Sequence, residues 1–190
     1  AVMTFKTGVM KDGSITARQA RLVYDSGGYA AFKPAKGVTY GYRCLGPYKI
    51  PNAHIDSDVV YTNQVPCGSM RAPGDPQSIF AAEAQIDLIA RELKMDPVQF
   101  RLKNLVQDGD ASPLGHYWKD IMGVKTLDAA VGEAEYNQPK PQIAGKLTGR
   151  GVALCERHVG AGSSTVKITI DAEGLVTLYT ALPDTGSGFY

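Results

Sequence analysis

The residues best placed to do chemistry lie in the stretch VPCGSMRAPGDPQSIF, residues 65–80, where Arg71 stands among glycines and prolines just ahead of a helix start. The first amides of a helix lack internal partners and the helix dipole is positive there, so this loop could bind an anion together with the arginine. The alternative is a turn arginine paired with a carboxylate, and spacing alone favours that alternative. Asp75 also lies close enough to oppose a bound phosphate.

Two glycine-rich segments and one Cys-His pair are weaker candidates. Residues 184–188, DTGSG, could bring backbone close to a ligand, and residues 160–164, GAGSS, lack the lysine and spacing of a P-loop. Cys155 and His158 would face opposite sides of a strand and have no second pair, so we expect no metal site there. The other two histidines stand apart from any serine or cysteine that would complete a hydrolytic triad.

The elements that must position these residues begin with β structure. Residues 2–10 and 15–25 alternate in polarity around Lys11-Asp12-Gly13, which predicts a hairpin with an Asp-Gly turn. Residues 54–63 also have the character of a strand. The first part of the chain is therefore predicted to be mostly β.

Helices are predicted next. Over residues 75–93 apolar residues recur at spacings of three and four, with Asp75 as the expected cap and Pro76 in the first turn. Asp96-Pro97-Val98-Gln99 predicts a second helix that begins with a capping box and runs to about residue 103. A third, short helix is expected from a Thr126 cap to about residue 135.

The C-terminal part returns to a β pattern. We expect strand character in VALCERHV from residue 152, and a hairpin of VKITI and LVTLYTA around residues 171–174. The turn residues of the central stretch predict a linker at 108–122, between a first region (1–107) and the start of a second, truncated region (123–190). The fold class expected is α+β, with mixed and antiparallel sheets and packed helices.

The composition of the chain excludes some classes of function but does not identify one. Twenty Lys and Arg balance nineteen Asp and Glu without a basic run, so nucleic-acid binding is not expected. No apolar stretch approaches the roughly 20 residues of a membrane span, and the N-terminal residues lack the pattern of a signal peptide. Three widely spaced cysteines are compatible with a reducing compartment, and we expect a cytoplasmic protein with packed thiols.

Taken in order, four segments resemble the molybdenum-cofactor-binding subunit of the xanthine dehydrogenase and aldehyde oxidase family. These segments are GVMKDGSITARQARLVYDSGGYA, YKIPN, MRAPGDPQSIFAAEAQIDLIARELKMDPVQFRLKNL, and GRGVAL followed by DAEG and DTGSG. The positions that match the family's patterns are Arg71, Gly74, Pro76, Gln77, Asp96, Pro97, Arg101, Asn104 and Leu105. The resemblance covers nearly the whole chain and implies a molybdopterin-binding-domain-like fold.

The resemblance implies that the loop around Arg71 and Ala72 borders a molybdopterin pocket and that Gly186, Ser187 and Gly188 contact the cofactor. Family members oxidise an aldehyde or an N-heterocyclic aromatic with oxygen from water, using a glutamate base. Electrons then leave through [2Fe-2S] clusters and usually FAD on other domains or subunits. The cofactor would supply the chemistry, and the protein would supply orientation and electrostatics.

Several positions depart from the family's patterns and restrict the substrate. Ala72 stands where the copper-containing carbon monoxide dehydrogenases have cysteine, which argues against a molybdenum-copper site. Thr39 and Pro73 occupy substrate-pocket positions where purine-oxidising members have an arginine and an aromatic residue, so xanthine is not expected. Ser187 replaces a frequent glutamine and weakens that cofactor contact.

The glutamate base and part of the cofactor pocket lie outside this stretch in the family. We therefore expect a fragment with no catalytic residue and no direct metal ligand of its own. Its expected partners are the remainder of the molybdenum subunit, iron-sulfur and FAD subunits, and a small-molecule substrate. Two alternatives remain open: a non-catalytic scaffold that retains the fold, and a free-standing anion-binding domain built on the helix start at Asp75.

Overall fold

The structure is a computed structural model of the 190-residue chain. It describes residues 1–29, 41–66, 72, 74–113, 115–140, 142–156 and 163–181, with the backbone alone at 41 and 42. The chain divides into two compact units, residues 1–156 and 157–190. The second unit contains a hairpin, and the first contains all the helices of the described part and a three-stranded sheet.

The sheet of the first unit has the order β1-β2-β3, with β1 at Val2–Val9, β2 at Ile15–Gly27 and β3 at Asn52–Tyr61. The predicted hairpin is confirmed, since β1 and β2 pair antiparallel around a turn in which Gly13 has a φ of 90°. β3 pairs with β2 in parallel, so the chain must cross over between these strands. The crossover includes a short 3-10 helix, η1, at Gly41–Leu45.

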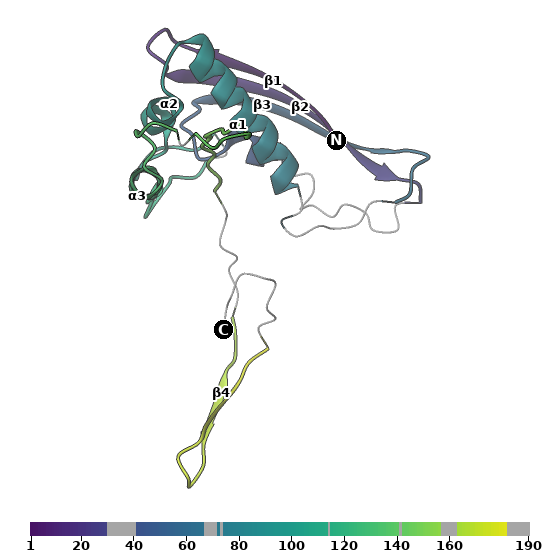
Figure 1. Cartoon of the computed structure of the whole chain (residues 1–190). Coiled ribbons are helices and arrows are strands. Elements are labelled where there is room, and N and C mark those ends of the chain that lie inside the picture. The colour runs from purple at the N-terminus through teal and green to yellow at the C-terminus, as the bar shows by residue number, and fades with distance from the viewer. Residues whose placement is uncertain are drawn as a thin grey trace. The chain divides into compact units, whose positions relative to one another are not determined.

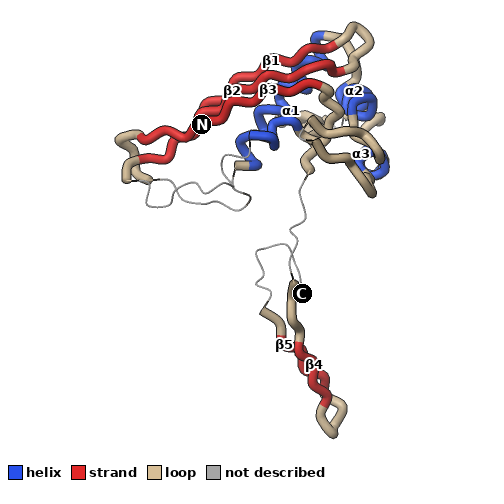
Figure 2. The backbone as a smooth tube through the Cα atoms, turned by 180° about the vertical axis from the view of Figure 1, so that it is seen from behind, coloured by secondary structure: helices blue, strands red, loops and turns tan. Residues whose placement is uncertain are grey.

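The helices of this unit are α1 at Asp75–Glu92, α2 at Pro97–Asn104 and α3 at Gly123–Glu133. Figures 1 and 2, which view the chain from opposite sides, show α1 running across one face of the sheet. The predicted helices at 75–93 and 97–103 are confirmed. The Asp96 side chain accepts hydrogen bonds from the amides of Val98 and Gln99, as expected of an N-cap.

The main core lies where the helices meet η1 and the turn after it. Its fully buried centre includes Ile86 of α1 and Phe100 of α2. Leu127 of α3 is buried in the same core, so residues beyond the predicted linker belong to the first compact unit. The location of the family's domain boundary at 108–122 stays a prediction.

Three local expectations were wrong. Gly74, not Asp75, is the N-cap of α1, because the Asp75 carboxylate lies against the guanidinium of Arg43 instead. Thr126 lies inside α3, which begins at Gly123 after Met122. Residues 151–156 alternate in burial as a strand would, but they form no strand and lie against the helical core through Val152 and Leu154.

The second unit is described at residues 163–181. β4 (Lys167–Ile170) and β5 (Val176–Tyr179) form the predicted antiparallel hairpin. Its turn is held by the Asp171 carboxylate, which accepts hydrogen bonds from the amides of Glu173 and Leu175. The mixture of small sheets and packed helices confirms the α+β class, and no helix in the described part of the chain is long and apolar enough to cross a membrane.

Candidate functional site

The backbone that enters α1 takes an unusual path. Ala72 and Gly74 have φ values of 60° and 82°, which places both in the left-handed region. The Ala72 carbonyl accepts a hydrogen bond of 3.1 Å from the Asp75 amide, and the Gly74 carbonyl accepts one of 3.3 Å from Ser78. A non-glycine residue in this region costs roughly 1–2 kcal/mol, and such backbone strain clusters at functional sites.

The start of α1 has the chemical features of an anion site. No side chain among the described residues caps the 18-residue helix, and its N-terminus carries the positive end of the helix dipole. The Asp75 carboxylate would oppose an anion, but Arg43 Nε lies 3.2 Å from Asp75 Oδ1. Both side chains are nearly buried. The Arg43 charge therefore offsets the negative charge of Asp75, which by sequence alone argued against anion binding at this helix start.

The same Arg43 joins a third segment. Its Nη1 donates a hydrogen bond of 3.2 Å to Glu156 Oε1, so one guanidinium on η1 contacts both the start of α1 and the end of residues 151–156. Sequence reasoning missed this arginine. The only signal was a charged residue within the otherwise aromatic and apolar segment YGYRCLG, residues 40–46.

A second contact secures the first turn of α1 on the sheet. The hydroxyl groups of Tyr24, on β2, and Ser78 share a hydrogen bond of 3.0 Å, and both side chains are buried. Burial raises the pKa of the Tyr24 phenol, so it stays protonated at neutral pH. The beginning of α1 is therefore held from η1 and from β2.

The middle of α1 is anchored by a buried carboxylate. Glu83 accepts hydrogen bonds from the Tyr48 hydroxyl at 2.6 Å, from Arg101 Nε at 3.0 Å and from the Leu154 amide at 2.9 Å. Arg101 also pairs with Asp87 at 2.8 Å. Burial, reinforced by the Glu83 charge, raises the pKa of Tyr48, which keeps its proton for this bond.

Three residues that matched the family's patterns, Asp96, Arg101 and Asn104, have structural roles in the first unit. Arg101 fixes α1 through Glu83, and Asp96 caps α2. The Asn104 side chain accepts from the Ile15 amide at 2.9 Å and donates to the Gly13 carbonyl at 2.9 Å, so it connects α2 to the β1-β2 turn. These side chains hold α1, α2 and the β1-β2 turn together.

Arg18 on β2 and Cys44 on η1 are both buried and in contact with each other. Arg18 of β2 donates from Nη1 to the Cys44 carbonyl at 2.6 Å and from Nε to Thr7 at 3.1 Å, with its guanidinium over the Phe5 ring. Burial raises the pKa of the Cys44 thiol to about 11, which makes it inert as expected. Cys155 is exposed, contrary to the expectation that it is packed.

Most of the predicted site residues lie outside the described part of the chain. These are Thr39, Arg71, Pro73, Gly186, Ser187 and Gly188. Of the predicted cofactor contacts, Ala72 alone is described: it is half-buried and lies directly before the uncapped helix start. The predicted proximity of Arg71 to residues 186–188 therefore stays a prediction. Among the described residues no group of three or more His, Cys, Asp or Glu could hold a metal ion.

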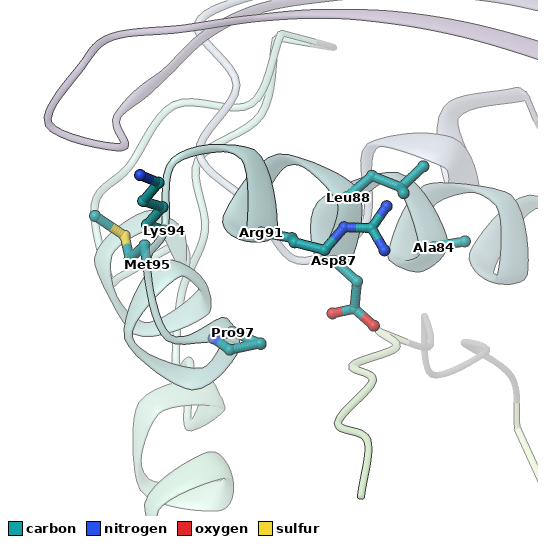
Figure 3. Close-up of a pocket in the computed structure, with 7 residues that line it drawn as sticks. All are labelled: Ala84, Asp87, Leu88, Arg91, Lys94, Met95 and Pro97. Atoms are coloured by element: carbon teal, nitrogen blue, oxygen red, sulfur yellow. The ribbon is translucent and has the colours of Figure 1, made fainter. Parts of the chain in front are cut away.

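A groove of about 700 Å³ lies at the other end of α1 (Figure 3). It is lined by Ala84, Asp87, Leu88, Arg91, Lys94, Met95 and Pro97. At 1.5 Å of rise per residue its first member is about 14 Å beyond the helix start, and the Asp87 carboxylate that faces it is already paired with Arg101. None of the described residues that line the groove is a predicted site residue.

Comparisons with known proteins show the family to which the chain belongs. Residues 1–105 match the molybdopterin cofactor-binding domain family. The nicotinate dehydrogenase large molybdopterin subunit of Eubacterium barkeri is 36% identical over 129 residues, which are 67% of this chain and 30% of that protein. The aldehyde oxidoreductase of Megalodesulfovibrio gigas is 30% identical over 193 residues, 98% of this chain and 21% of that protein.

The fold agrees as well. The solved aldehyde oxidoreductase from Desulfovibrio gigas superposes with a TM-score of 0.67 and 26% identity, over 94% of this chain and 20% of that one. The chain thus spans less than a third of the length of each of these relatives. The family match covers β1, β2, β3, the helix-entry loop (residues 71–74), α1 and α2, so the chain belongs to the molybdopterin cofactor-binding domain family of the xanthine dehydrogenases and aldehyde oxidoreductases.

Proposed function

We propose that the chain is part of the molybdopterin-binding subunit of a molybdenum hydroxylase, and that residues 71–74 form one wall of the cofactor pocket. The observation that carries the proposal is the family match over residues 1–105, which includes this loop and the uncapped helix that follows it. The charge-compensated Asp75 makes the helix start compatible with an anionic cofactor.

The bound cofactor would supply the oxidation chemistry, in which water provides the oxygen added to the substrate. This chain's contribution is to bind and orient. In this wall Gly74 would let the backbone come close to the cofactor, because it has no Cβ and accepts a left-handed conformation. The Arg71 guanidinium would bind an oxygen acceptor of the cofactor or substrate, and Gly186–Gly188 would add a second backbone contact.

The proposed substrate is an aldehyde or an N-heterocyclic aromatic compound. Two of the similar proteins are named for an aldehyde and for nicotinate. Thr39 and Pro73 provide neither the arginine nor the aromatic ring of purine-oxidising members, so xanthine is disfavoured. Ala72 provides no thiolate for a copper ion.

The complete enzyme would include more than this chain. We propose that its glutamate base comes from the remainder of the molybdenum subunit, and that iron-sulfur and FAD partners accept the electrons. The widely spaced cysteines, with Cys44 a buried free thiol, agree with the proposed cytoplasmic location.

Native purification of the full-length protein tests the proposal. Metal analysis should find molybdenum in stoichiometric amounts, and acid oxidation should release a fluorescent pterin. Arg71→Met should reduce both amounts relative to protein, whereas Arg21→Met should leave both unchanged because Arg21 is exposed on the sheet. A well-folded full-length protein that contains neither molybdenum nor pterin would contradict the proposed function and favour a non-catalytic scaffold.

A further inference from the structure

The start of α1 has an electrostatic link to two other segments of the chain. Arg43 is 8% exposed, and it contacts Asp75 at 3.2 Å through Nε and Glu156 at 3.2 Å through Nη1. Asp75 is the first residue of α1, and its amide donates to the Ala72 carbonyl at 3.1 Å. The guanidinium therefore reaches the helix-entry loop through a side chain and one backbone hydrogen bond.

The arginine has features that suit a positioning role. Its planar fork contacts two carboxylates in different directions, which a point charge such as an ammonium would not reproduce. The buried Asp75 and the partly buried Glu156 leave little water to screen these contacts. Water therefore screens these pairs less than it screens the exposed pair of Arg21 and Asp58.

We propose that Arg43 is a positioning residue for the proposed cofactor pocket, because it holds Asp75 and Glu156 together and so fixes the backbone of the loop that ends at Gly74. The inference rests on the proposed function for its consequence, and on the contacts above for its geometry. Arg43 does not touch the cofactor. It acts through Asp75 on Ala72 and Gly74, the residues in the left-handed conformation.

The chain offers a matched control for this role. Arg101 is also a buried arginine that pairs two carboxylates, Glu83 and Asp87, but it contacts the middle of α1. Replacing either arginine with lysine keeps the charge and removes the fork. Both Arg43→Lys and Arg101→Lys should lower the free energy of unfolding. Only Arg43→Lys should change the protection of the amides at the helix-entry loop.

The test uses the full-length protein and two readouts: hydrogen exchange and molybdenum content. In Arg43→Lys the amides of Asp75 and Ser78, which donate to the Ala72 and Gly74 carbonyls, should exchange about tenfold faster while those of residues 85–92 keep their protection. In Arg101→Lys the pattern should be reversed. At equal folded fraction, Arg43→Lys should also release molybdenum and pterin faster during gel filtration than Arg101→Lys.

The outcomes separate this inference from the proposed function. If wild-type protein holds molybdenum and Arg43→Lys matches it in both readouts, the positioning role is refuted and the function stands. If wild-type protein holds no cofactor, the proposed function fails, and the exchange pattern still decides whether Arg43 orders the loop. Should Arg43→Lys fail to fold, the paired Asp75→Asn and Glu156→Gln variants take its place, and unchanged exchange at the amides of residues 75 and 78 in both would refute the role.

Discussion

Glu83 connects α1 to the rest of the first unit, and its replacement by glutamine should be strongly destabilising. The carboxylate accepts from Tyr48, from Arg101 and from the Leu154 amide, and the residue is only 5% exposed. Glutamine preserves the shape but offers one acceptor oxygen, and its amide group would face hydrogen-bond donors. At least one buried donor therefore loses its partner, and the Arg101 charge loses its buried counter-ion.

The magnitude follows from these losses. Removing one partner of a buried ion pair costs about 3–5 kcal/mol, and each hydrogen bond to a charged group contributes about 1.5–3 kcal/mol. Because Asp87 still pairs with Arg101, we expect a loss of about 3 kcal/mol for Glu83→Gln. Such a loss is a large part of the roughly 5–15 kcal/mol that stabilises a typical domain.

Urea unfolding followed by circular dichroism and by tyrosine fluorescence would measure the free energy of unfolding, provided that the two transitions coincide. Asp58→Asn is the control, since its exposed pair should contribute about 0–1 kcal/mol. The double variant Glu83→Leu/Arg101→Met should be less destabilised than the sum of its single variants, because no buried charge is left unpaired and the Asp87 carboxylate is half-exposed to water. A loss below about 1 kcal/mol for Glu83→Gln would refute the reasoning.

Three further substitutions test the core, a backbone contact and the acid limit of stability. Ile86→Ala should cost about 2–5 kcal/mol in urea unfolding because Ile86 is fully buried. Gly27→Ala should lower the melting temperature, because φ is 73° and the new Cβ would lie 2.6 Å from the Val65 carbonyl oxygen. The hydrogen bond from the Lys49 ammonium lowers the pKa of the Asp110 carboxyl in the folded protein. The wild-type protein should therefore be more stable than Asp110→Asn above about pH 4, and this difference in the free energy of unfolding should vanish as pH falls through the lowered folded pKa.

Each of these predictions has a contrary result. Leu88→Ala is the control for Ile86→Ala, because Leu88 is half-exposed on the same helix, and it should cost no more than about 0.5 kcal/mol. An equal loss of stability in both variants would show that the buried face of α1 is misassigned. Gly109→Ala shares the positive φ but meets no atom within 4 Å, so an equal drop in melting temperature would exclude the Val65 clash as the cause. A pH-independent stability difference would exclude the Lys49 pairing as the origin of the Asp110 effect.

The local signals of the sequence account for much of the fold. An Asp-Gly turn between alternating segments predicts the β1-β2 hairpin, and the spacing of Ile86 with its apolar neighbours predicts α1. The Asp96-Pro97 pair predicts the start of α2. These features depend on residues close together in the chain, so one sequence is sufficient to find them.

Features that depend on distant residues were missed or misread. Asp75 has the sequence of a cap, but Arg43 withdraws its carboxylate from the helix amides. Residues 151–156 have the alternation of a strand, but Leu154 donates its amide to Glu83 and not to a neighbouring strand. Thr126 marks a possible helix start, but α3 begins three residues earlier, at Gly123.

The candidate site also has a part that local sequence predicts and a part that depends on distant residues. The glycine, the prolines and the arginine before α1 indicated a binding loop, but sequence alone left its charge balance unresolved. The structure resolves that balance through Arg43, which is far from Asp75 and farther from Glu156 along the chain. No periodicity or local motif encodes a contact of that kind. The role of Arg71 itself rests on the family resemblance.

An experimental structure of the intact protein with its cofactor tests the central claim most directly. The distances to measure are those from the cofactor to the Arg71 guanidinium, to the backbone of Ala72 and to the backbone of Gly186–Gly188. The proposed function predicts that all three groups lie in contact with one bound molybdopterin. A cofactor bound elsewhere, with Arg71 and the glycines on separate surfaces, would contradict it.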